Sequence, residues 1–424
     1  MSRRLIALLI LGVATLTACG RSASTQPASG GYRLFLEEGY SDAGQHVTVR
    51  DATTGTIERL LPIGTPAPDW SRYFTVSQVS GADRVTAIDP ATGRTVAQTS
   101  VPAGYTLPNF GNLGPSVGLS PNGQWLTLTD NGRATTGKLV TSFLVGQSSL
   151  STPFKTVQLD GAFSFDALSN DGQSLYVIQA MGDEIHYQVR LYDLTSNALM
   201  PQPVVDKVEP TEPMQGIRGD SVASSAGDSV YTVYLRDGGP FIHALPLNFP
   251  FAFCVDLPKD AANDMEKQFG WSLAISPDGS TVYAANGPLG IVAAMTTGTA
   301  PKIVRTGQVA LNPGGGLLAG FVTEADAKGS PIGGAALSKD GRTLFTLAGA
   351  GIFAIDTSTL KVKTRILQST NVASIRMSAD GKWLYAADAS SSKVWQIDPA
   401  TGAVHGETKG VTNPWAVLWA EKSP

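Results

Sequence analysis

Runs of alternating apolar and polar residues, each broken by a tight turn, follow one another along most of the chain. The clearest is ISPDGSTVYAAN at 275–286, and similar stretches occur at 119–130, 168–179, 337–348 and 377–388. Each predicts two antiparallel strands joined by a turn, because Asp-Gly and Asn-Gly pairs tolerate the positive φ that such a turn needs. The predicted turn residues are Asn122, Gly123, Asp171, Gly172, Asp278, Gly279, Asp340, Gly341, Asp380 and Gly381.

A second turn follows the third strand of each unit. It is clearest as IDPATG, which occurs at 88–93 and again at 397–402. Pro restricts φ early in this turn, and Gly93 or Gly402 closes it in a left-handed conformation. A fourth strand, such as 404–409, then leads into the next unit. Four antiparallel strands in each unit predict the blade of a β-propeller.

The spacing of the first turn predicts one closed all-β domain. With weaker copies at Pro68 and Ser225 included, successive turns lie 40 to 62 residues apart and about 52 on average, which is the size of a propeller blade. No helical period of useful length interrupts the series, and no Pro- or Gly-rich linker divides the chain after residue 31. We therefore expect a single propeller rather than several domains.

The two ends of the repeat region complement each other. Residues 32–61 contain three candidate strands that match the second, third and fourth strands of a unit, whereas 414–420 matches a first strand with nothing after it. A blade built from both ends would close the ring and remove exposed sheet edges. With the seven internal turns, this composite predicts eight blades. Seven blades is the alternative, because two of the seven turns are weak.

The SPDG…LYVA and ID…TG motifs resemble those of YVTN-type and related WD40-like bacterial propeller repeats. The resemblance covers nearly all of residues 32–420 and implies a propeller fold, but it implies no particular function because the motifs are turn chemistry. The GH…WD signature of WD40 repeats themselves is missing, and the sialidase-type Asp box does not match SPDGST.

The first residues have the features of an export signal. Arg3 and Arg4 precede an apolar run at 5–16, and the segment ends LTAC at Cys19. This ending resembles the bacterial lipobox, which implies lipid on Cys19 and anchorage to the outer face of a bacterial membrane. We expect a signal peptide at 1–19, a flexible tether at 20–31 and the propeller at 32–424. The general secretory route is favoured over twin-arginine export.

Composition narrows the classes of partner and the redox chemistry. The chain of 424 residues is 42% hydrophobic and 16% charged, and its formal net charge is −4. This charge balance lacks the clustered basic residues that nucleic-acid binding requires, so no nucleic acid is expected. The other cysteine, Cys254, has no partner for an internal disulfide and stands among apolar residues. We expect it to be a small buried apolar side chain.

Side chains that carry chemistry do not form a recognisable motif. None of the histidines has metal-ligand spacing to another His or to a Cys, and there is no G-x-S-x-G nucleophile elbow. The Gly-rich stretch 312–320 lacks the G-K-[ST] ending of a phosphate loop. We assign no catalytic, metal or cofactor-binding residues and expect no cofactor. The tryptophans are expected to pack between blades. The histidines are His46, His186, His243 and His405.

Two functions are consistent with this sequence. The favoured one is a monomeric, membrane-anchored binding or scaffold propeller that takes a protein or a small polar ligand at one face of the ring or in its axial channel. The alternative is an enzyme, such as a lactonase-like or metal-assisted hydrolase or a quinone-dependent dehydrogenase. Three or more Asp, Glu, His or Asn side chains at the channel mouth would favour metal-assisted hydrolysis, and a lining of Ser, Thr and aliphatics would favour binding.

Long connections are the expected place for recognition on such a scaffold. The segments 308–334 and 201–216 lengthen their repeats and break the pattern. Because loops on a rigid scaffold commonly carry binding residues, we expect one of these two segments to reach over an end of the ring.

Overall fold

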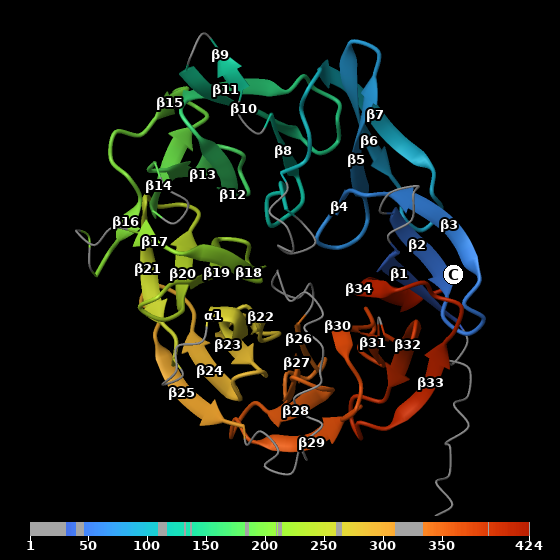
Figure 1. Ribbon diagram of the computed structural model, residues 1–424. Helices are drawn as coiled ribbons and strands as arrows, with labels where there is room; N and C mark the ends of the chain where they lie inside the picture. Colours follow the sequence, from blue (N-terminus) through green and yellow to red (C-terminus); the bar gives the residue numbers. More distant parts are fainter. Residues whose placement is uncertain are drawn as a thin grey trace, which may run out of the picture.

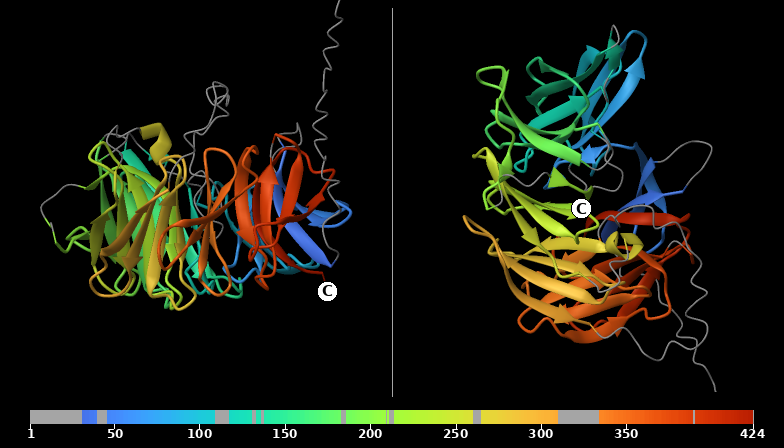
Figure 2. Two further views of the ribbon diagram at one scale, coloured as in Figure 1. Left: turned by 90° about the horizontal axis from the view of Figure 1, so that it is seen from below. Right: turned by 60° about the vertical axis from the view of Figure 1, so that its left-hand side comes forward.

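Eight small sheets stand around a common axis and form a closed ring (Figure 1). Seen from the side, the ring is a disc whose sheets stand next to one another (Figure 2). The computed structural model describes residues 31–39, 46–108, 117–130, 133–135, 138–182, 186–208, 210, 214–259, 265–309, 334–388 and 390–423. The eight-bladed prediction is confirmed, and the seven-bladed alternative is wrong.

Each blade is numbered by its place along the chain, and its strands are given from the axis outward. Blade 1 consists of β34 (Pro414–Lys422), β1 (Tyr32–Glu38), β2 (His46–Asp51) and β3 (Ile57–Pro62). Blade 2 consists of β4 (Thr65–Pro66), β5 (Tyr73–Val79), β6 (Ala82–Ile88) and β7 (Thr95–Pro102). Blade 3 consists of β8 (Trp125–Thr129), β10 (Lys138–Gln147) and β11 (Lys155–Asp160), with β9 (Arg133–Thr135) paired to β10. Blade 4 consists of β12 (Phe163–Leu168), β13 (Ser174–Ala180), β14 (His186–Asp193) and β15 (Ala198–Leu199), with β17 (Met214–Gln215) paired to β14.

The second half of the ring is more regular. Blade 5 consists of β18 (Ile217–Ala223), β19 (Ser229–Leu235), β20 (Phe241–Pro246) and β21 (Phe251–Asp256), with β16 (Val205–Asp206) added in parallel to β21. Blade 6 consists of β22 (Trp271–Ile275), β23 (Thr281–Asn286), β24 (Ile291–Thr296) and β25 (Ile303–Gln308), and it is preceded by the short helix α1 (Met265–Gln268). Blade 7 consists of β26 (Ala335–Leu337), β27 (Thr343–Leu347), β28 (Ile352–Asp356) and β29 (Val362–Ile366). Blade 8 consists of β30 (Val372–Met377), β31 (Leu384–Asp388), β32 (Lys393–Ile397) and β33 (Val404–Thr408).

The ends of the chain meet in blade 1, as the sequence predicts. The C-terminal strand β34 pairs antiparallel with β1, and it supplies the first strand that residues 32–61 lack (Figure 1). Bonds from the ends to blade 8 secure the junction: the Tyr32 hydroxyl donates to Asp380 Oδ2 at 2.7 Å. The Ala379 N–H donates to the Ala420 carbonyl at 2.8 Å. Closure therefore uses both hydrogen-bonded pairing within blade 1 and contacts to its neighbour.

A buried ion pair lies inside the composite blade. Arg50 Nη2 donates to Glu38 Oε2 at 2.8 Å, and both side chains are almost fully buried. The Thr412 N–H, just before β34, donates to the same Glu38 oxygen at 3.1 Å. A buried carboxylate is tolerated only when its charge and its hydrogen-bond capacity are both satisfied. Glu38 thus connects the first strand of the chain to its last one.

The turn motif is held by a serine as well as by the Asp-Gly pair. Ser276 Oγ donates to Asp278 Oδ1 at 2.5 Å and accepts the Thr281 N–H at 3.0 Å, while Gly279 has a φ of 72°. The serine two residues before the Asp or Asn makes equivalent side-chain bonds in the turns of blades 3, 4, 7 and 8. In the second turn, Gly93 and Gly402 each have a φ of 73°. These residues hold the turns, and Ser120 of blade 3 also lines a pocket described below.

Blade 3 departs from the predicted four-stranded pattern at its first strand. Leu119, which precedes the turn, forms only an isolated bridge with Leu126 rather than a strand. Thr106 forms a second isolated bridge with Thr129. Among the described residues of blade 3, these two isolated bridges are thus the pairings on the free side of β8.

The apolar core is divided among the junctions between neighbouring blades. At the junction of blades 8 and 1, Tyr385 and Val394 pack with Leu34 and Leu36 in one buried cluster. The tryptophans mostly contribute to such packing: Trp271 is fully buried, and Trp70 of blade 2 stacks on Trp419 of blade 1 with ring centroids 5.7 Å apart. Trp415 is the exception, since its side chain is 40% exposed. In the described part of the chain, no helix is both long enough and apolar enough to cross a membrane.

Candidate functional site

Bulges in the strands nearest the axis bring charged side chains to the centre of the ring. The pairing of β12 with β13 shifts between Phe165 and Ala167, which leaves Asp166 as the extra residue. The pairing of β18 with β19 shifts between Arg218 and Ser221. A β-bulge redirects the side chain of the extra residue and is frequent beside functional sites. Blades 4 and 5 therefore present polar groups where the regular alternation would not.

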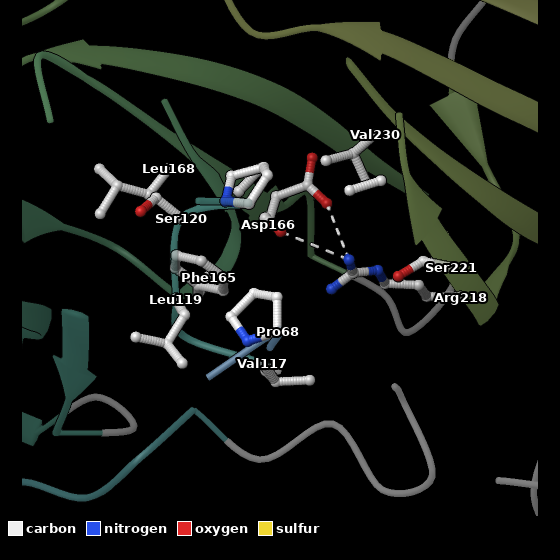
Figure 3. Close-up of a pocket in the computed structure, with 13 residues that line it drawn as sticks. Pro68, Val117, Leu119, Ser120, Phe165, Asp166, Leu168, Arg218, Ser221 and Val230 are labelled. Carbon is white, nitrogen blue, oxygen red and sulfur yellow. Dashed lines mark hydrogen bonds and ion pairs between the residues drawn. The ribbon is translucent and has the colours of Figure 1, made fainter. Parts of the chain in front are cut away.

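These two bulges flank a pocket beside the axis. It has a volume of about 240 Å³, and its walls come from blades 2, 3, 4 and 5. We call it the axial pocket. Figure 3 shows Arg218 pointing toward Asp166 on one side, with Pro68, Leu119 and Phe165 opposite. The remaining lining residues are Val117, Ser120, Pro121, Ala167, Leu168, Ser221, Ala223 and Val230.

A charge pair is the main polar feature of the axial pocket. Arg218 Nη2 lies 3.5 Å from Asp166 Oδ1 and donates to the Asp166 backbone carbonyl at 3.4 Å (Figure 3). Their side chains are only 11% and 3% exposed. Asp166 Oδ2 is buried and makes no hydrogen bond with any described residue. A buried carboxylate oxygen without a partner is costly, and this one belongs to a residue that lines the pocket.

A second acid, Asp220, lies two residues after Arg218 on β18. Asp220 Oδ2 accepts the Leu273 N–H of blade 6 at 2.8 Å, so it bridges two of the strands nearest the axis. Burial raises the pKa of Asp220 to about 6, although the bonds from Leu273 and Ser221 and the charge of Arg376 oppose this effect. Burial likewise lowers the pKa of Arg376 in β30, and the charge of Asp220 counters that shift.

The lining of the axial pocket contains both an acidic side chain, the type expected of a hydrolase, and the Ser and aliphatic residues expected of a binding site. It has one carboxylate, paired with an arginine, together with two serines and mostly apolar walls. Across the described residues, no three His, Cys, Asp or Glu side chains are grouped so that they could hold a metal ion. The axial pocket thus has the composition of many recognition sites, in which few polar groups orient a ligand within apolar walls.

The structure spreads the four histidines over different strands. His243 in β20 is fully buried, and burial lowers its pKa, so the neutral imidazole is favoured. Its ring meets the Tyr234 ring edge-on with centroids 5.8 Å apart. His405 in β33 lies against Trp383, with ring centroids 4.6 Å apart. His46 begins β2 and His186 begins β14.

Cys254 is more exposed than the sequence predicts. The sequence predicts a buried side chain, whereas Cys254 is only half-buried on β21. It packs at the edge of the cluster between blades 4 and 5, and its N–H donates to Asp206 Oδ2 at 3.2 Å. The reason is that β21 is the fourth strand of blade 5, and its pairing with β16 covers only Phe251 and Ala252, so Cys254 lies beyond the covered part.

Of the two long connections, only the one at 201–216 lies largely within the described residues. Residues 310–333, most of the longer one, lie outside the described residues, as do the signal segment and Cys19. The connection at 201–216 supplies β16 and β17, which add to the outer parts of blades 5 and 4. Its two strands therefore extend the rim of the ring, and that one of the long connections reaches over an end of the ring stays a prediction.

The comparisons with known proteins concern the fold. No family model and no curated protein matches the chain. Among solved structures it is similar to the dihydro-heme d1 dehydrogenase NirN in complex with DHE, at 14% identity and a TM-score of 0.52, over 92% of this chain and 76% of that one. It is also similar to apo AztD from Citrobacter koseri, at 11% identity and a TM-score of 0.52, over 93% and 98% of the two chains. The periplasmic gluconolactonase PpgL of Pseudomonas aeruginosa has 18% identity and a TM-score of 0.42, over 83% and 96%.

The two matches with a TM-score of 0.52 show a shared propeller architecture and no shared activity, because one fold supports unrelated functions. The propeller fold implied by the repeat motifs is confirmed. Membership in the YVTN-type group stays a prediction.

The raised pKa of Asp220 predicts a pH dependence of stability. An unfolded Asp titrates near pH 3.9, whereas Asp220 in the folded protein titrates at about 6. The folded state then binds more protons between these values, so this residue's contribution to stability falls as the pH rises from about 4 to about 6. The variant Asp220→Asn, which keeps an oxygen acceptor, should gain stability relative to the native protein over that range.

Urea unfolding at a series of pH values measures this difference. The control is Asp160→Asn, at an exposed position that ends β11. A stability difference between native protein and Asp220→Asn that is flat from pH 4 to 7 would contradict the assignment.

Proposed function

We propose that this chain is a non-catalytic binding propeller that takes a small polar ligand in the axial pocket. We further propose that it is exported and held at the outer face of a membrane by lipid on Cys19. The observation that supports binding is a charge pair enclosed by apolar walls, with one carboxylate oxygen of Asp166 left without a hydrogen bond from any described residue.

The chemistry of the axial pocket constrains its ligand. At about 240 Å³ it is smaller than the ~300–1,000 Å³ of sites for drug-sized molecules. A hydrogen-bond donor on the ligand would meet Asp166 Oδ2, and an apolar body would meet Leu119, Phe165 and Val230. A small molecule with an amine, amide or hydroxyl on an apolar frame fits both features.

Asp220 supports a second candidate. A carboxyl group whose pKa is about 6 can exchange a proton near neutral pH, which general acid–base catalysis requires. Together with the neighbouring charge of Arg376, this arrangement favours a hydrolase of the lactonase-like kind as the alternative. If the native protein converts a bound ligand and Asp220→Asn does not, the chain is an enzyme. If the native protein releases the ligand unchanged, it is a binding protein.

The binding proposal predicts that the protein retains a small molecule from its own cell. Full-length protein is purified from its native membranes, and the bound compounds are quantified by native mass spectrometry. We expect Asp166→Asn to reduce retention about tenfold or more, because a charge-assisted bond is worth roughly 1.5–3 kcal/mol. Ser221→Leu should also reduce retention, since it fills the pocket without touching the charge pair.

The matched control is Arg84→Met, at an exposed position of β6 far from the axis. Equal retention by the native protein, Asp166→Asn and Ser221→Leu would overturn the assignment of the site.

The lipid anchor predicts a simple change of partitioning. Native protein should enter the detergent phase of Triton X-114, whereas Cys19→Ala should stay in the aqueous phase or remain unprocessed, because it lacks the sulfur that carries the lipid. Mass spectrometry of the N-terminus checks the modification. Partitioning that is the same for both proteins would show that Cys19 carries no anchor.

A further inference from the structure

A groove at the junction of blades 5 and 6 is separate from the axial pocket. Its volume is about 610 Å³, and it is lined by turns of both blades, including those that carry Asp228 and Asp278. We call it the junction groove. It opens on the face that holds the turns between first and second strands, and it shares no lining residue with the axial pocket.

An exposed aromatic ring stands at the junction groove in a fixed position. Phe249 is 53% exposed, and its ring stacks on Phe251 with centroids 5.5 Å apart and an interplanar angle of 22°. Phe251 in turn meets Phe253 edge-on at 5.7 Å. From blade 4, the buried Tyr176 donates its hydroxyl to the Phe249 carbonyl at 3.0 Å. The Phe249 side chain is thus a platform held in place by its neighbours. Its exposure is unfavourable for the folded protein, because apolar surface stays in contact with water.

Charged groups of both signs surround this platform. Lys207 Nζ lies 4.6 Å from the centroid of the Phe251 ring. Asp228 and Asp278 contribute exposed carboxylates, and Asn248 contributes an amide that can both donate and accept. Hydrogen-bond donors and acceptors therefore stand around an apolar surface.

Lys207 belongs to the connection that breaks the repeat. Its N–H donates to the Ala252 carbonyl at 2.9 Å, directly after β16 pairs with β21. Asp206 fixes the same segment by accepting the N–H groups of Val208 at 2.8 Å and Cys254 at 3.2 Å. The added strand β16 therefore brings the ammonium group of Lys207 to the groove. A blade of only four strands would have no such group there.

We propose that the junction groove binds a saccharide. A sugar ring presents C–H groups of slight positive charge on one face, which suits the negative face of an aromatic ring, and hydroxyls around its edge. The exposed ring of Phe249 would take the face, while Lys207, Asn248 and the two carboxylates would meet the hydroxyls. An aliphatic chain would offer these polar groups no hydrogen bond, and a cation would compete with Lys207 for the aromatic face.

This inference goes beyond the proposed ligand of the axial pocket and needs no contact with it. The test uses the full chain, and its probes are linear oligosaccharides of glucose, galactose, mannose, N-acetylglucosamine and uronic acids. Affinities come from calorimetry. We expect at least one of these to bind, and we expect Phe249→Ala and Lys207→Met each to weaken binding by about tenfold.

Matched variants separate this site from the rest of the molecule. Leu60→Ala truncates a side chain that is 57% exposed on β3 of blade 1, and Asp166→Asn alters the axial pocket; both should bind the saccharide as the native protein does. Urea unfolding verifies that Phe249→Ala remains folded. Binding of none of the five saccharide classes, or binding that survives Phe249→Ala, would overturn the proposal. Loss of binding in Asp166→Asn alone would place the saccharide at the axis and would equally overturn it.

Discussion

The pairing of the last strand with the first one is the constraint on which the ring depends. The main strands of every other blade come from one continuous stretch of the chain, so they find their partners without a long search. Blade 1 is different, since β34 and β1 come from opposite ends of the chain. Without that pairing, β1 and the neighbouring junction clusters would expose strand edges and apolar side chains. The buried Glu38, with its bonds to Arg50 and to the Thr412 N–H, makes this junction specific as well as apolar.

The repeat is interrupted at two places in this ring. The bulges in β12 and β18 give up regular pairing and turn Asp166 and the region of Asp220 toward the axis. The extra strand β16 adds Lys207 to the rim of blade 5. In both places the repeat is broken locally, and the rest of the architecture supports the break. The candidate recognition sites of this protein are therefore departures from its repeat.

The architecture could be predicted from the sequence because short local patterns determine it. Asp-Gly turns, alternating strands and complementary ends are all visible in a single chain, and they led to eight blades with the composite at the right place. The candidate sites were not predictable in the same way. Asp166 and Asp220 lie at bulges and Arg218 lies beside one, and these bulges depend on pairing with β13 and β19, which the sequence does not show. The segment 201–216 was marked by its length, but its destination at the rim depends on the edge that β21 leaves open. Cys254 shows the same limit, since its half-burial follows from the outer place of β21.

The closure of the ring is tested most directly by removing residues 411–424 and adding them back as a peptide. Urea unfolding followed by near-ultraviolet circular dichroism compares this truncated chain with the native protein and with a chain that ends at Lys422. We predict that the truncated chain loses cooperative unfolding and fixed tertiary packing, that one equivalent of the peptide restores both, and that the chain ending at Lys422 behaves almost as the native protein does. A truncated chain that unfolds cooperatively with the native free energy would contradict closure by β34, because something else would then close the ring.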